Sequence, residues 1–181
     1  MKLPGVSRRT LLIGGGAGVG LIVAFLAWPR REGSPLRAGP DERVFGPFLR
    51  VSTDGRVTLA TPQVETGQGI WTGLAQIAAD ELGAAWQTMA VEPAPHNAAY
   101  ANRLFAQDYG VSTRITAGSS SIRAFEQPLR EAAAVARAML SRAAADRWGV
   151  NAAECDAEGG FVVHEGKRLG FGEIAAAAAA L

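Results

Sequence analysis

From residue 45 onward the chain alternates short apolar runs with turn-forming residues. Residues 48–51 and 57–60 are two such runs, and Asp54-Gly55 lies between them. An Asp-Gly pair between apolar runs is a strong local signal for a β-hairpin. The stretch "GFVVHEGKRLGF" predicts a second hairpin with its turn at Glu165-Gly166, and "QTMAVEPA" predicts a short strand.

Helical spacing of apolar residues marks the segments between these strands. One such face covers residues 70–82 and is followed by Gly83, a common stop signal. A longer stripe covers residues 129–148, and Pro128 fits the first helical position because its fixed φ suits that place. The serines at 119–121 then lie either on a short preceding turn or at the start of a kinked longer helix.

Two further segments complete the folded part. Residues 96–118 show no convincing period and are predicted to form a long loop. The closing "FGEIAAAAAAL" begins a helix, and the alanine run at its end looks like a truncation as much as a natural terminus. The pattern as a whole predicts an α/β fold (α+β-like), with two β-hairpins and packed helices, over residues 44–181.

Residues 1–28 have the layout of an export signal. In "SRRTLL" two arginines precede the uncharged residues 10–28, and a charged region followed by an apolar one is typical of such signals. The motif resembles a twin-arginine signal, which serves proteins exported already folded. The uncharged run is nearly long enough to span a bilayer at about 1.5 Å per residue, so an uncleaved anchor is the alternative. We therefore expect a periplasmic protein, or one anchored in the inner membrane and facing the periplasm, with a linker over residues 29–43.

The charge distribution argues against a nucleic-acid partner. Residues 1–31 carry five basic side chains and no acidic one, and the other 150 residues carry 13 basic and 17 acidic side chains, which leaves −4. No basic patch is therefore expected outside the leader. The single cysteine, Cys155, excludes an intramolecular disulfide and any multi-cysteine metal or iron–sulfur site within this chain. His96 and His164 lack ligand spacing, so no metal ligands are predicted.

Two small-residue segments stand directly before predicted helices and are the candidate site. They are Gly67-Gln68-Gly69 and Gly118-Ser119-Ser120-Ser121. Helix N-termini carry unpaired N–H groups and a partial positive charge, so they bind anions such as phosphate. Glycine allows close approach to the backbone, and serine and glutamine add donors, which suits a large anionic cofactor. Plain helix capping is the alternative, because glycine and serine are common capping residues.

A family resemblance covers nearly all of residues 45–181. The segment "VETGQGIWTGLAQIAADELGAAW" resembles the GQG segment of the molybdenum-binding subunit in the xanthine dehydrogenase and aldehyde oxidase superfamily. The segment "TAGSSSIRAFEQPLREAAAVARAML" resembles the second pterin-contacting segment of that subunit. In layout the chain is most similar to the large (β) subunit of the isoquinoline 1-oxidoreductase type, with the same motifs in the same order behind a twin-arginine leader.

The resemblance implies an oxidoreductase subunit that binds molybdenum as molybdopterin cytosine dinucleotide. Such enzymes hydroxylate N-heterocycles or oxidise aldehydes, take oxygen from water, and pass electrons to a separate iron–sulfur (2Fe-2S) small subunit. By carry-over, Gln68 with Gly67 and Gly69 would lie against the cofactor near the metal. Gly118 and the serines Ser119, Ser120 and Ser121 would hold the pterin or its phosphates.

The chain also departs from the family pattern. Thr66 stands where methionine is usual and Ala117 where glycine is frequent, and neither change removes a polar contact. Family members continue for several hundred residues, and that part supplies the catalytic glutamate. Glu65 and Glu81 do not match its motif and are read as a loop acid and a solvated helix acid. We therefore expect no catalytic residue here, and a chain inactive without the remainder of the large subunit. The alternative is a non-catalytic, membrane-anchored α/β binding module that keeps the fold.

Overall fold

The computed structural model describes residues 34–181. The predicted signal or anchor over residues 1–28 and the first part of the linker therefore lie outside the described residues. The strands are β1 (Glu42–Phe45), β2 (Leu49–Ser52), β3 (Val57–Thr61), β4 (Met89–Pro93), β5 (Asp156–Glu158), β6 (Phe161–His164) and β7 (Lys167–Gly170). The α-helices are α3 (Ile70–Leu82), α4 (Arg103–Tyr109), α5 (Ser121–Trp148) and α6 (Phe171–Ala179), and short 3-10 turns are η1 (Trp86–Thr88), η2 (Ala98–Tyr100) and η3 (Ala152–Glu154).

The larger sheet has the order β1-β2-β3-β4. Strands β1, β2 and β3 form an antiparallel meander, whereas β4 pairs in parallel with β3, with Leu59 opposite Val91. Parallel neighbours need a crossover connection, and α3 provides it between β3 and β4. The carboxyl ends of β3 and β4 therefore meet at one edge of the sheet, the edge at which open α/β sheets commonly bind ligands.

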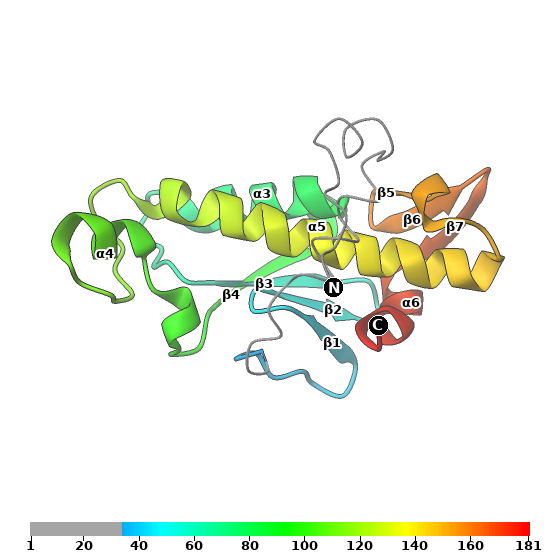
Figure 1. Cartoon of the computed structure of the whole chain (residues 1–181), viewed down its shortest axis with the longest axis horizontal. Coiled ribbons are helices and arrows are strands. Elements are labelled where there is room, and N and C mark those ends of the chain that lie inside the picture. The colour runs from blue at the N-terminus through cyan, green and yellow to red at the C-terminus, as the bar shows by residue number, and fades with distance from the viewer. Residues whose placement is uncertain (1–33) are drawn as a thin grey trace, which may run out of the picture.

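The main core lies between this sheet and the helices α3 and α5. Figure 1 shows both helices side by side along one face of the sheet, and they pack against each other. Leu49, Val51 and Leu59 of the sheet are fully buried, as are Leu74 of α3 and Leu129 of α5. The alternation of apolar and polar residues in β2 puts Leu49 and Val51 on the helix side, while Arg50 lies on the opposite face.

A smaller sheet, β5-β6-β7, packs against the second half of α5. All its pairings are antiparallel, and β6 and β7 form a hairpin in which His164 is opposite Lys167. The 28 residues of α5 thus contact both sheets (Figure 1). Helix α6 follows β7 and lies against β1 and β2, so the end of the described chain ties the two sheets together.

The predicted α/β class, both hairpins, the strand near residue 90 and the three longer helices are confirmed. The start of the long helix is not at Pro128: α5 begins at Ser121 and contains Pro128, which agrees with the longer of the two alternatives. The predicted loop over 96–118 is wrong in part, because it contains η2 and α4. Side-chain caps explain α4, since Asn102 accepts from the N–H groups of Leu104 and Phe105.

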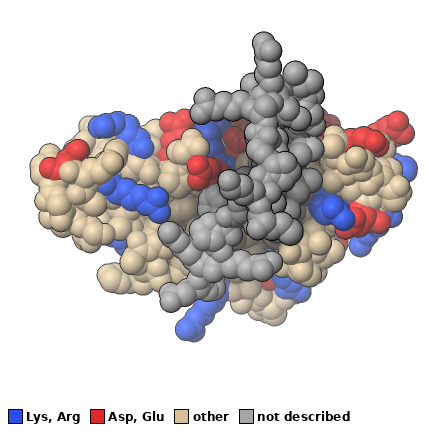
Figure 2. All heavy atoms as spheres, viewed as in Figure 1, with Lys and Arg blue, Asp and Glu red and all other residues tan. Residues whose placement is uncertain are grey.

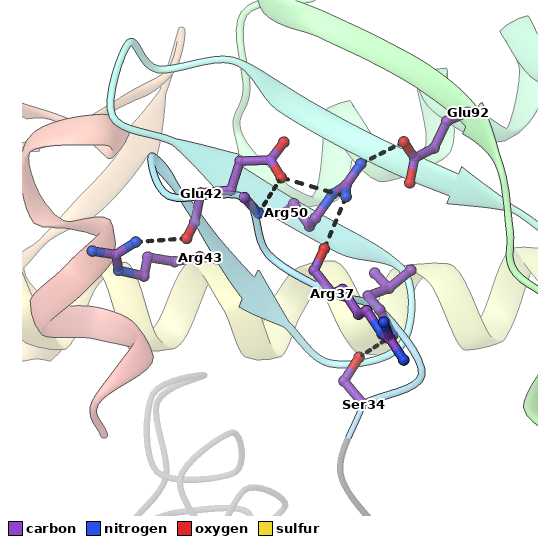
Figure 3. A network of polar contacts seen from close by, with 8 residues as sticks. Ser34, Arg37, Glu42, Arg43, Arg50 and Glu92 are labelled. Atoms are coloured by element: carbon purple, nitrogen blue, oxygen red, sulfur yellow. Dashed lines mark hydrogen bonds and ion pairs between the residues drawn. The ribbon is translucent and has the colours of Figure 1, made fainter.

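Residues 34–43 of the predicted linker lie among the described residues and contact the larger sheet. Strand β1 begins at Glu42, inside the predicted range of 29–43, and Leu36 is buried. The Arg50 guanidinium donates to the Arg37 carbonyl oxygen at 2.9 Å, contacts Glu42 at 3.4 Å and pairs with Glu92 (Figure 3). These contacts tie the segment before β1 to β2 and β4. Among residues 34–181, no helix combines the length and the apolar run needed to cross a bilayer.

Candidate functional site

The two predicted segments lie at the same end of the molecule. Helices α3 and α5 run in the same direction, because Gly73 lies beside Ile122 near their starts and Asp80 pairs with Arg130 farther along. Both N-termini therefore point the same way, as do the two loops that precede them. That end is also where β3 and β4 finish, so the fold brings together the carboxyl ends of the parallel strands and both candidate segments.

Hydrogen bonds join the loop before α3 to the loop before α5. The Ser121 hydroxyl donates to Gln63 Oε1 at 2.7 Å, and the Val64 N–H donates to Thr116 Oγ1 at 2.9 Å. Gln63 is only 2% exposed, so its bond to Ser121 is shielded from solvent. The two segments, which are about 50 residues apart in the sequence, thus form one connected surface.

The Gly67-Gln68-Gly69 segment is an exposed loop built around a carboxylate. Gly67 and Gly69 have φ of 98° and 75°, values that side chains other than glycine rarely adopt. One carboxylate oxygen of Glu65 accepts from the N–H groups of Gly67 at 2.8 Å and Gly69 at 2.9 Å. The other accepts from Trp71 N–H in the first turn of α3 at 3.0 Å. The sequence-based interpretation of Glu65 as a plain loop acid is therefore incomplete, because it caps the helix.

The side chain of Gln68 is turned toward its own loop. Its Nε2 donates to the Val64 carbonyl oxygen at 2.8 Å, and its Oε1 accepts from the Thr66 N–H at 2.6 Å and the Thr66 hydroxyl at 3.0 Å. These partners fix the amide orientation, since a carbonyl must face Nε2 and an N–H must face Oε1. Both acceptor positions of Oε1 are occupied, while Nε2 keeps one N–H for a further partner.

The serine segment divides into an exposed and a buried part. Gly118 and Ser119 are exposed and both have positive φ, of 61° and 49°. Ser120 is 4% exposed; its hydroxyl donates to the Ala117 carbonyl oxygen and accepts from Asn102 Nδ2, each at 2.7 Å. Ser120 thus holds the loop together, Ser121 binds Gln63, and the hydroxyl of Ser119 is the one directed to the surface.

The two helix starts differ electrostatically. At α3 the N–H of Trp71, and then those of Gly69 and Gly67, hold the pKa of Glu65 below its ordinary value, so this start already carries a negative charge. At α5 no side chain caps the helix, no acidic residue lies in the first turn, and the exposed Arg123 lies there. The α5 start is therefore the more favourable of the two for an anionic ligand.

Three residues at this end of the molecule were not predicted from the sequence. Glu65 caps α3, and the buried side chains of Gln63 and Asn102 bind Ser121 and Ser120. Glu65 offered one signal, because a negative charge near a helix start is favourable there. Gln63 and Asn102 offered none, since their partners Ser121 and Ser120 are far away in the sequence.

Two depressions in the described surface lie away from these loops. One of about 740 Å³ lies on the small sheet beside Phe161 and His164, and one of about 570 Å³ lies on the open face of the larger sheet around Arg50. Within residues 34–181, His, Cys, Asp and Glu side chains form no group of three that could hold a metal ion. On the face of the molecule shown in Figure 2, acidic and basic side chains are interspersed over the described residues.

Comparison with known proteins identifies a family and several longer relatives. The molybdopterin cofactor-binding domain family matches residues 18–181. The chain is 32% identical over 175 residues to the beta subunit of isoquinoline 1-oxidoreductase from Brevundimonas diminuta. This match covers 94% of the chain and 22% of that protein. It is 29% identical over 176 residues to a membrane-bound aldehyde dehydrogenase (pyrroloquinoline-quinone) of Gluconacetobacter polyoxogenes, with 94% and 21% covered.

A third relative is a subunit of nicotinate dehydrogenase from Pseudomonas putida, 33% identical over 139 residues, with 74% of this chain and 10% of that protein covered. Among solved structures, quinoline 2-oxidoreductase of Pseudomonas putida 86 matches with a TM-score of 0.47 and 22% identity, over 71% of this chain and 15% of that one. The chain thus spans about a fifth or less of the length of these relatives.

Proposed function

The chain belongs to the molybdopterin cofactor-binding domain family, and from this premise we propose that the surface formed by its two loops contacts the cofactor. The proposed site consists of Gly67, Gln68, Gly69, Gly118 and Ser119, which face the cofactor, and of Ser120 and Ser121, which support them from behind. The observation that carries the proposal is the common orientation of α3 and α5, joined by the hydrogen bond between Ser121 and Gln63. Two segments chosen from the sequence as separate candidates thereby become one exposed surface at the ligand-binding edge of a parallel strand pair.

The chemistry of this surface fits a pterin with attached phosphates. Gln68 keeps a free N–H donor, Ser119 exposes a hydroxyl, and Arg123 adds a positive charge at the start of α5. In this proposal Ser120 and Ser121 act from behind the surface, because their hydroxyls bind Asn102 and Gln63. When bound, molybdopterin supplies the redox-active molybdenum; this chain supplies donors and shape.

We further propose that the chain acts within an assembly of the molybdenum hydroxylase kind. In that assembly the cofactor is the cytosine dinucleotide form, the remainder of the large subunit supplies the catalytic residues, and a 2Fe-2S small subunit accepts electrons. The substrate class is an aromatic N-heterocycle or an aldehyde, oxidised with oxygen from water. Export through the twin-arginine route, or anchoring at the inner membrane facing the periplasm, completes the proposal and rests on residues 1–28.

Analysis of the native complex tests the cofactor. The assembly that contains this chain would be purified from its source cells, and its molybdenum, pterin and released nucleotide would be measured. We expect molybdenum and pterin in equal amounts and cytidine monophosphate as the nucleotide. A complex that contains pyrroloquinoline quinone and no molybdenum would refute the proposal, an outcome that the name of one relative makes worth measuring.

Variants test the residues. Gln68→Ala combined with Ser119→Gly removes both exposed donors, and glycine accepts the positive φ of position 119. We expect the molybdenum content per chain to fall by about tenfold or more. The matched control is Gln127→Ala with Ser112→Gly, which alters two exposed polar residues outside the surface. Equal molybdenum contents in variant and control would contradict the site.

A further inference from the structure

The N-terminus of α3 is filled by a charge from its own chain. Glu65 receives the N–H groups of Gly67, Gly69 and Trp71 at distances between 2.8 and 3.0 Å. Backbone N–H groups of this kind are the groups with which a helix start holds an external phosphate or carboxylate. The glycine-rich loop, which from sequence alone looks like an anion-binding loop, therefore has its anion in place.

The same carboxylate determines the shape of the loop. Gly67 and Gly69 take positive φ, and their N–H groups thereby converge on one oxygen of Glu65. With the backbone held in this form, Val64 and Thr66 are placed to bind the Gln68 amide, and one N–H of Nε2 is left over. The orientation of Gln68 thus depends on the contacts that Glu65 makes.

We propose that Glu65 is a positioning residue of the cofactor loop, which fixes Gly67-Gln68-Gly69 before the cofactor arrives and excludes phosphate from the α3 start. The proposal deepens the proposed function and rests on it for the identity of the ligand. A carboxylate in this place occupies the N–H groups of Gly67, Gly69 and Trp71 and repels an incoming phosphate. The α3 loop then contacts uncharged parts of the cofactor through Gln68, and its phosphates are left to the serine segment and Arg123.

Amide resonances of the ¹⁵N-labelled full chain in detergent micelles test the first half of the proposal, with inorganic phosphate as the probe. In the wild type we expect the amides of Gly67, Gly69 and Trp71 to keep their positions as phosphate is added. In Glu65→Ala we expect them to lose their hydrogen-bonded shifts, and added phosphate to restore those shifts in part. A phosphate response at these amides in the wild type, equal to that in Glu65→Ala, would overturn the proposal.

Cofactor retention in the purified complex tests the second half. Glu65→Gln keeps the size of the side chain but replaces one acceptor oxygen by an NH₂ group, and Glu65→Asp keeps the charge on a shorter arm. We expect Glu65→Gln to lower pterin content by about tenfold, and Glu65→Asp to recover part of that loss. The matched control is Glu173→Gln, because Glu173 accepts from Gly170 N–H at the start of α6 in the same manner but away from the loops. Full pterin content in Glu65→Gln would refute the positioning role.

The amide measurements and the pterin measurements together distinguish a failure of this proposal from a failure of the proposed function. The amide measurements need no cofactor, and unchanged core resonances of Leu74 and Leu129 show that each variant folds. A wild-type complex without pterin would refute the proposed function, while the amide result would still decide whether Glu65 closes the α3 start. A complex with pterin, whose content is the same in Glu65→Gln, would refute the role of Glu65 alone.

Discussion

At the scale of single residues, the site depends on which polar groups are already satisfied. Glu65, Thr66 and Val64 use most of the hydrogen-bonding capacity of the first loop, and Gln68 keeps one donor. In the serine segment, Ser120 is bound from behind, whereas Ser119 is exposed. A list of polar residues would rank these side chains equally, yet their burial and partners give them different roles.

The titration of Glu65 leads to a prediction for pH. Hydrogen bonds from Trp71 and the two glycines lower its pKa from the ordinary 4.5, so the charged form is favoured in the folded loop. The stabilisation is therefore complete above pH 4.5 and is lost as the pH falls through the lowered pKa. We expect hydrogen exchange at Gly69 and Trp71 to accelerate in that acid range beyond its intrinsic pH dependence. Glu65→Gln should abolish this extra acceleration; if it persists, another group causes it.

The serines give a prediction for stability. The buried Asn102 Nδ2 donates to Ser120 at 2.7 Å and to the Ile115 carbonyl oxygen at 3.3 Å. Ser120→Ala removes the first of these partners, and a buried N–H left unsatisfied costs about 1–3 kcal/mol. Ser119→Gly removes an exposed hydroxyl and relieves positive φ, so we expect a change within about 0.5 kcal/mol. Urea unfolding of both variants measures the difference. Equal losses for the two would show that the buried bond contributes nothing.

At the scale of elements, local signals and long-range contacts explain what could be predicted. The Asp54-Gly55 and Glu165-Gly166 turns carry their own chemistry, so both hairpins could be predicted from short stretches. Helix α3 could be placed because apolar spacing and Gly83 agree on its end. These signals come from residues adjacent in the sequence, so the elements that they mark can be predicted from a single sequence.

The elements that could not be predicted depend on contacts between distant parts of the chain. Pro128 signals a helix start, but packing of Ala124 and Phe125 in the core keeps the helix intact through the proline, so α5 begins earlier, at Ser121. Strand β1 has few apolar residues and is held by its pairing with β2 and by Arg50. In the site, the two loops could be chosen from sequence, but their junction through Gln63 could not.

Helix α6 gives a prediction in which two effects oppose each other. By helix propensity alone, Gly172→Ala should stabilise the protein by about 0.5–1 kcal/mol. A Cβ atom at Gly172, however, would lie 2.3 Å from the Thr53 carbonyl oxygen and 2.7 Å from the Gly55 nitrogen. Both are backbone atoms of the β2–β3 turn, so we expect a net loss of about 1–3 kcal/mol by overpacking. Thermal unfolding measures the sign, and a raised melting temperature would contradict the close approach.

At the scale of the whole molecule, α5 is the element that makes one folding unit of two sheets. Its first half packs with α3 over the larger sheet, and its second half contacts β5 and β6. Helix α6 returns to β1 and β2, so the small sheet is connected to the large one on two sides. One loop of the site lies at the start of α5 and is bonded through Ser121 to the segment before α3, so the geometry of both loops depends on a core that reaches the far end of the molecule.

This arrangement predicts a single unfolding transition with coincident probes. Trp71 reports on the site end, because its Nε1–H donates to the Gln63 carbonyl oxygen at 2.8 Å. Trp148 reports on the small sheet, because its ring stacks on His164 with centroids 6.2 Å apart. In each variant that keeps only one of these tryptophans, the others being replaced by phenylalanine, we expect fluorescence to give the same urea midpoint and slope as circular dichroism of that variant. An earlier transition at Trp148 would mean that the small sheet unfolds by itself, and the site would then not depend on it.

Replacement of Leu140, which is fully buried in the second half of α5, by alanine should lower the midpoints reported by Trp71 and by Trp148 together, with a loss of about 2–5 kcal/mol.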